Sequence, residues 1–390
     1  MKKYIAIATL ALLAGAACSK VETVESTVDT PITFSVVNHL AQTKATDGLE
    51  YPTDVPFGSF AWWTSAKWAS TADADKLNFV FMNNEQIKYS ATPKEWAPVN
   101  TYYWTKTGYI TFASYSPYVS TADKGFSDVP EFDVTNGFKF VDYTIVDDTD
   151  IDVMYANLAT DCTKDTNADG SDVTNSLGGT PDDGFTGVPT IFNHALCKVG
   201  FAFRAVGNKN PNVNNIVIDV TKVTVKNVDK KGTFTQNVTA PTVRWASSHA
   251  VGNYTNYVYT GTTINLPLLE DNSTNRDATN NYTAFSSPKI LLPQSLVDSS
   301  DAIASTTDQV VEVEYTVKIE YTSKTGTYAT ESVASTVRLK NGSIAAWGDN
   351  KNITYNITIN PYSDTKITFD PAVLDWEVQA SDDIELPKNI

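Results

Sequence analysis

The chain has 390 residues, and 29 Lys and Arg against 45 Asp and Glu give it a net charge of −16 at pH 7. This acidic balance argues against binding of nucleic acid through a basic surface, and three His and three Cys leave little material for imidazole catalysis, a zinc centre or a disulfide framework. We therefore expect a protein that is not an enzyme and has no cofactor, with two domains, because the length is about two to three times that of a typical domain.

The N-terminus has the pattern of an export signal. Lys2 and Lys3 precede an apolar run from Ile5 to Ala14, and small residues then lead into Cys18. The run is shorter than the roughly 20 residues that span a bilayer. Small residues directly before a cysteine are typical of a bacterial lipoprotein signal, so we expect removal of residues 1–17 and attachment of lipid to Cys18. An ordinary secretory signal with an incidental cysteine is the alternative.

The rest of the chain has the pattern of β-strands. Apolar and polar side chains alternate strictly from Gln309 to Tyr321, and the same alternation occurs at residues 353–359, 199–203 and 32–36. A period of two predicts half-buried strands, and the dominant residue types, Thr, Val, Tyr and Ile, favour them. Because no segment of comparable length holds a 3.6-residue period, we predict an all-β fold of antiparallel sandwiches.

Two polar stretches bear on the domain organisation. The stretch from Asp161 to Gly187 is interpreted as an excursion within a domain, because the predicted strand Thr190 to Arg204 follows it and needs partners. The second stretch, Ala205 to Asn215, lies between two strands and is rich in Asn, Gly and Pro. We place the domain boundary there, so that residues 45–204 form one sandwich and residues 205–390 form the other.

The first polar stretch also contains a candidate calcium loop. Asp165, Asn167 and Asp169 alternate before a glycine, as the oxygen ligands of such loops do. The twelfth position is Ser176, however, where a bidentate Glu is needed, so the pattern favours a solvated acidic loop and we predict no metal site. No pattern predicts catalytic residues.

Two further sets of residues leave alternatives open. Cys162 and Cys197 either form a disulfide, as an oxidising compartment permits, or remain separate thiols. Trp62, Trp63 and Trp68 crowd one segment. They form either an exposed platform for glycan or part of a β core, where aromatic residues are also common.

Several stretches together resemble the fimbrillin family, the Mfa-like and major fimbrial subunits that build type V pili on Gram-negative anaerobes. Each stretch is weak alone, but their shared order runs through nearly the whole mature chain. The stretches are Ile32–Ser35, Thr43–Thr46, Phe57–Ala61, Tyr103–Trp104, Ile110–Pro117, Asp152–Ala156, Phe192–Val199, Leu292–Gln294 and Ile367–Asp370, the last leading to Val373 and Trp376.

The resemblance implies a lipoprotein precursor with two tandem transthyretin-like antiparallel β-sandwich domains. In this family a trypsin-like protease cleaves after a basic residue in the loop that follows the first strand, and loss of that strand opens a groove that a neighbouring subunit fills. The matching positions here are the strand Ile32 to Val37 and Lys44, directly before Ala45. Residues 18–44 would then be a propeptide. Lysine stands where arginine is frequent in the family.

The resemblance also implies that the C-terminal tail, residues 366–390, supplies the donor strand. Its candidate apolar groups are Ile367, Phe369, Val373, Trp376 and Val378. These residues would otherwise finish the second sandwich as an integral strand.

The expected protein is thus a structural fimbrial subunit on the cell outer membrane and surface, exported through the periplasm and supporting adhesion and biofilm. Its expected partners are other fimbrial subunits, the outer membrane through the lipid before maturation, and the processing protease. The alternative is a surface lipoprotein that does not polymerise and binds glycan or a host ligand.

Overall fold

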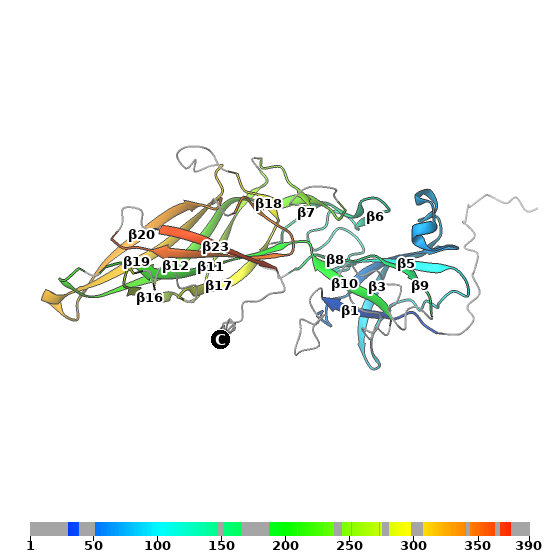
Figure 1. The fold of residues 1–390 in the computed structure, drawn as a ribbon, viewed down its shortest axis with the longest axis horizontal. Helices are drawn as coiled ribbons and strands as arrows, with labels where there is room; N and C mark the ends of the chain where they lie inside the picture. Colours follow the sequence, from blue (N-terminus) through cyan, green and yellow to red (C-terminus); the bar gives the residue numbers. More distant parts are fainter. Residues whose placement is uncertain are drawn as a thin grey trace, which may run out of the picture.

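Strands make up nearly all of the regular structure in this computed structural model (Figure 1). The structure describes residues 30–38, 51–146, 151–164, 187–208, 210–237, 244–250, 252–272, 274, 281–297, 307–340, 344–362 and 367–375. Within these ranges, three short 3-10 helices interrupt the strands: η1 (Trp68–Ser70), η2 (Asp73–Asp75) and η3 (Thr322–Lys324). The all-β fold predicted from the alternation is therefore confirmed. None of the helices within the described ranges is long and apolar enough to cross a membrane.

The N-terminal half forms a closed ring of strands. The pairing runs β2-β3-β4-β1-β10-β8-β5 and returns to β2, while β9 pairs with β5 beside β8. Closure of a sheet removes most of the free strand edges that invite further pairing, although β1 and β4 pair at a single position. The strands are β1 (Phe34–Asn38), β2 (Phe57–Thr64), β3 (Val80–Ala91), β4 (Lys94–Pro98), β5 (Tyr109–Ser116), β8 (Met154–Ala156), β9 (Ala159–Cys162) and β10 (Val188–His194).

The C-terminal half is one continuous sheet with the order β20-β19-β12-β16-β11-β22-β23, in which β15 also pairs with β12 and β17 with β11. Residues of β11, β12, β19 and β22 share a single core, and we call this unit the C-terminal sandwich. Register shifts in β12 let this long strand bend and change its partner from β16 to β15. The strands are β11 (Cys197–Val206), β12 (Val213–Asp229), β15 (Tyr254–Tyr259), β16 (Ile264–Leu269), β17 (Thr283–Leu291), β19 (Val310–Tyr321), β20 (Tyr328–Arg338), β22 (Lys351–Ile359) and β23 (Ile367–Asp375).

A smaller sheet with the order β14-β13-β7-β6 connects the halves, which lie end to end along the long axis of the molecule (Figure 1). Its strands are β6 (Glu131–Asp133), β7 (Gly137–Thr144), β13 (Lys231–Thr235) and β14 (Trp245–Ala246). Beside it, β18 (Gln294–Ser295) pairs with β21 (Ala346–Trp347). One apolar cluster joins Tyr115 and Phe138 of the first half to Phe234 and Trp245 of the second. The two units therefore share a core and do not merely follow each other on a linker.

The strand pairings around the predicted domain boundary, between residues 204 and 205, place β11 with the strands of the second half. The run predicted as one strand, Thr190 to Arg204, is two strands: β10 belongs to the ring and β11 to the sandwich. The chain passes between them at Ala195 and Leu196. Both residues are fully buried in the cluster that the two halves share. The sequence there has no polar residues of the kind that would indicate a turn between two strands. The polar stretch after β11 is a loop between two strands of the second half.

Some pairings also differ from the predicted antiparallel arrangement. The pairs β1–β10, β11–β16 and β11–β22 are parallel. Parallel strands need a long connection between them, and long stretches of chain separate the strands of each of these pairs.

Candidate functional site: the slot of the first strand

The first strand closes the ring between β4 and β10, and we call the space it occupies the first-strand slot. β1 runs parallel to β10, from Phe34 opposite Val188 to Asn38 opposite Phe192. Its other edge meets β4 only at Phe34, which lies opposite Trp96. Just before the strand, the Ile32 amide donates to the carbonyl oxygen of Tyr102 at 2.8 Å. β1 is therefore held mainly along one edge.

Alternation along this segment decides which side chains enter the ring. Ile32 and Phe34 are 1% and 3% exposed, whereas Thr33 and Ser35, which follow them in turn, are half-buried. The half-buried strand predicted from period two is thus confirmed here. The ring of Phe34 packs edge-on against Phe57 and Phe112, with both centroid distances 5.6 Å. Burial of these two apolar side chains contributes roughly 1.5–3 kcal/mol each.

Further aromatic residues pack into this core. Tyr51 stacks on Phe192 at 4.9 Å and meets Trp96 edge-on at 5.2 Å. Its hydroxyl forms a 2.7 Å hydrogen bond with the Ser116 hydroxyl, and burial raises the pKa of Tyr51 above its ordinary range. Without Phe34, this aromatic cluster would face an empty space.

Gly187 allows the backbone of the first strand to come close. Its φ is +153°, and a Cβ atom placed there would lie 2.8 Å from the carbonyl oxygen of Thr33. The same carbonyl accepts a 2.8 Å hydrogen bond from the Val188 amide. A side chain at position 187 would therefore push against the first strand where it enters the sheet. Sequence reasoning missed this residue, because a glycine that ends a polar stretch is not distinguished from an ordinary turn glycine.

Residues 39–50 connect β1 to the remainder of the ring and contain one Lys or Arg, Lys44. Lys44 and Ala45 lie outside the described residues, as does Cys18. The predictions that Lys44 is the cleavage site and that Cys18 carries lipid therefore stay predictions. Both ends of this connection are anchored, because Phe34 of β1 before it and Tyr51 after it belong to the ring core.

The C-terminal strand belongs to its own sandwich. β23 contains Ile367, Phe369 and Val373, and pairs antiparallel with β22 along its whole length. It is the last strand of its sheet, a position that tolerates Pro371 because an edge strand needs fewer amide donors. For residues 367–375 the structure thus shows the integral strand that the sequence left as the alternative. Trp376 and Val378 lie outside the described residues.

Two further candidates are the calcium loop and the two cysteines. Asp165, Asn167 and Asp169 lie outside the described residues, and the described part of the chain holds no group of three His, Cys, Asp or Glu suited to a metal ion. Cys162 and Cys197 are buried thiols in different cores, with no disulfide between them.

The three tryptophans do not form an exposed platform. Trp62 and Trp68 are 5% and 9% exposed in the cluster that the two halves share. Trp63 points to the other face of β2 and packs edge-on against Phe79. The core interpretation therefore holds for Trp62 and Trp68.

The model of the family described as fimbrillin-like matches residues 43–376, and the chain belongs to this family. The fold is similar to that of a fimbrial protein from Bacteroides vulgatus, with 18% identity, a TM-score of 0.56, and coverage of 89% of this chain and 99% of that one.

A fimbrial anchor protein from Porphyromonas gingivalis also aligns, with 13% identity, a TM-score of 0.30, and coverage of 89% of this chain and 97% of that one. A fimbrilin from the same species aligns with 9% identity, a TM-score of 0.34, and coverage of 90% and 98%. No curated protein sequence matches the chain.

Proposed function

We propose that this protein is a structural subunit of a cell-surface fimbrium, in which β1 is a temporary strand that a neighbouring subunit replaces. The observation that carries the proposal is the position of β1 and the residues just before it: Ile32 and Phe34 fill the ring core, yet β1 meets β4 at a single residue pair. Export as a lipoprotein through Cys18 and cleavage after Lys44 would precede assembly. Adhesion and biofilm formation would be the role of the finished fibre.

Cleavage would change what holds β1 in place. After a cut at Lys44, no covalent bond joins β1 to the ring, and its pairing with β10 and its buried side chains remain. Departure of β1 would leave unpaired backbone groups on β4 and β10 and expose the aromatic cluster around Phe57 and Phe112. A sheet edge beside apolar pockets binds an extended segment strongly. The uncut strand would therefore prevent premature assembly.

The donor that we propose is the tail that follows β23 in a second copy of the chain or in a related subunit. Residues 376–380 read Trp-Glu-Val-Gln-Ala, in which apolar and polar side chains alternate as a strand with one buried face requires. Because β23 is paired within its own sandwich, the donor would begin at Trp376 and not at residue 366. A buried aromatic anchor of this kind often dominates the binding energy of an interface.

Replacement of the basic residue tests the proposal. Lys44→Ala should leave a folded monomer that keeps its N-terminal strand, while wild type forms fibres. Lys88→Ala is the matched control, because Lys88 is an exposed lysine on β3 and lies outside the slot. Fibre formation by Lys44→Ala at the wild-type rate would refute cleavage-controlled assembly.

A further inference from the structure

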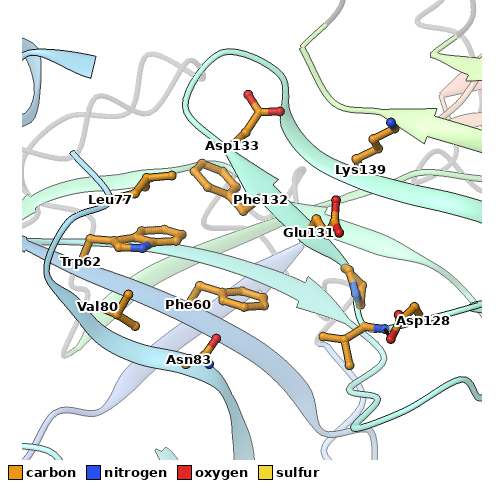
Figure 2. Close-up of a pocket in the computed structure, with 12 residues that line it drawn as sticks. Phe60, Trp62, Leu77, Val80, Asn83, Asp128, Glu131, Phe132, Asp133 and Lys139 are labelled. Atoms are coloured by element: carbon orange, nitrogen blue, oxygen red, sulfur yellow. Dashed lines mark hydrogen bonds between the residues drawn. The ribbon is translucent and has the colours of Figure 1, made fainter. Parts of the chain in front are cut away.

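A pocket lies outside the ring, between β2, β3 and the short strand β6 (Figure 2). Its volume is about 610 Å³, which falls in the range of sites for small molecules. Phe60 and Trp62 line it from β2, and Phe132 lines it from β6. None of its lining residues belongs to β1, β4 or β10, the strands that form the first-strand slot.

One wall of the pocket is formed by aromatic side chains. Phe60 and Trp62 are two residues apart on β2 and therefore share its outer face, where their rings are nearly parallel at 8°. The Phe132 ring lies 5.0 Å from Trp62, centroid to centroid. Trp62 is only 5% exposed, so it contacts the other two rings but offers little surface to a ligand. Phe60 and Phe132 are half-buried and present apolar surface to the pocket (Figure 2).

Polar side chains that can donate or accept hydrogen bonds surround this aromatic wall. Asn83 on β3, Asp128, and Glu131 on β6 are exposed and line the pocket. Lys139 lines it as well and is the cross-strand partner of Glu131. Carboxylates accept hydrogen bonds, the lysine donates them, and the asparagine amide does both.

The carboxylate of Asp133 is engaged in its own turn. It accepts hydrogen bonds from the Thr135 and Asn136 amides and from the Asn136 side chain, at 2.6–2.9 Å. Burial alone would raise the pKa of Asp133, but these hydrogen bonds and Lys139 lower it below its ordinary value. The group therefore stays ionised without serving as a free acceptor in the pocket.

We propose that this pocket binds a neutral saccharide. A pyranose ring has an apolar face of C–H groups, which suits the surface of Phe60 and Phe132, and hydroxyl groups at its edges, which both donate and accept hydrogen bonds. A purely apolar ligand would leave the polar rim without partners. The three carboxylates outnumber Lys139, so the lining is net negative and disfavours an acidic sugar.

Binding to a panel of immobilised oligosaccharides tests the proposal. The panel contains neutral oligosaccharides of glucose, galactose, mannose and N-acetylhexosamines, each beside its sialylated counterpart, and the protein is the full mature chain. At least one neutral oligosaccharide should be retained, and its sialylated counterpart should bind more weakly.

Two variants remove different parts of the pocket. Phe132→Ala removes the apolar surface, and Asn83→Ala removes an exposed amide without disturbing the core; each should weaken retention by roughly tenfold or more. Tyr328→Ala is the matched control, because Tyr328 is an exposed aromatic residue, at 44%, on β20 of the other half. Thermal melting checks the folding of each variant.

Three results would each overturn the proposal: no neutral oligosaccharide is retained, the two pocket variants bind as the control does, or sialylated members bind more tightly. Fibre formation is scored in parallel. Because the pocket shares no residue with the slot, Asn83→Ala should polymerise as wild type does, so failure of the saccharide proposal leaves the strand-exchange proposal standing.

Discussion

Gly187 lies close to the backbone of the first strand at Thr33. We expect Gly187→Ala to destabilise the ring by about 1–3 kcal/mol, because the added methyl group meets the Thr33 carbonyl and the backbone conformation is unfavourable for alanine. Hydrogen exchange of the amides in residues 32–38 should become faster than in wild type. Gly252→Ala is the control, since Gly252 also has positive φ but no atom within 4 Å of the added Cβ. Equal exchange of the β1 amides in both variants would argue against the close approach.

Tyr155 is buried in the core that the two halves share, and its ionisation should make the stability of the protein depend on pH. Burial raises its pKa from 10.0 to about 12, with the Asp349 carboxylate adding to the effect and Arg244 opposing it. The unfolded chain therefore releases this proton at a lower pH than the folded chain does. The contribution of Tyr155 to stability is fully present below pH 10 and is lost as the pH rises toward 12.

Denaturant unfolding of wild type and of Tyr155→Phe at pH 9 and at pH 11.5 measures this contribution. The wild type should lose more stability between the two pH values than the variant, which has no phenol to ionise. Parallel losses in the two proteins would contradict the assignment to Tyr155.

Cys197 should be inert in the folded protein. It is fully buried, and burial raises the pKa of its thiol well above the ordinary value, with Asp349 adding to the effect. Alkylation requires the thiolate and access, so iodoacetamide at pH 8 should leave Cys197 unmodified until denaturant is added. Mass spectrometry of the peptide that contains it provides the measurement, and rapid modification under native conditions would show that the core opens there.

Among the elements, β23 and the tail after it should behave differently on truncation. Deletion of residues 376–390 should leave the sandwich folded and abolish fibres, because β23 remains paired with β22. Deletion of residues 367–390 should also destabilise the sandwich, since β22 loses a partner over nine residue pairs. Thermal melting and electron microscopy separate the two effects. Fibres formed by the shorter deletion would exclude the tail as the donor.

Individual strands were predictable where one face is buried and the other is solvated. β19 and β22 lie where the alternation predicted them. The inward positions of Ile32, just before β1, and of Phe34 within it follow from the same rule. The crossing between β10 and β11 was not predictable, because Ala195 and Leu196 continue the apolar run through the turn. Local pattern shows which residues avoid water, but not which strand they join.

At the scale of the whole molecule, the pairing of distant segments decides the architecture. β7 pairs with β13, from Thr144 opposite Lys231 to Lys139 opposite Thr235, and the Trp245 indole donates to the Ala195 carbonyl oxygen. Neither contact has a signal in the sequence, because each depends on how the two halves meet. The ring closure that defines the slot is of the same kind: the single pair Phe34–Trp96 completes it.

The sequence of the N-terminus of subunits recovered from fibres tests the central claim, that assembly requires removal of the first strand. Lys44 is the one Lys or Arg between β1 and the rest of the ring, and cleavage after it leaves 390 − 44 = 346 residues that begin at Ala45. We predict that mass spectrometry and N-terminal sequencing of fibre subunits find this start and no residues 32–38. Fibre subunits that retain Ile32 and Phe34 would contradict the account.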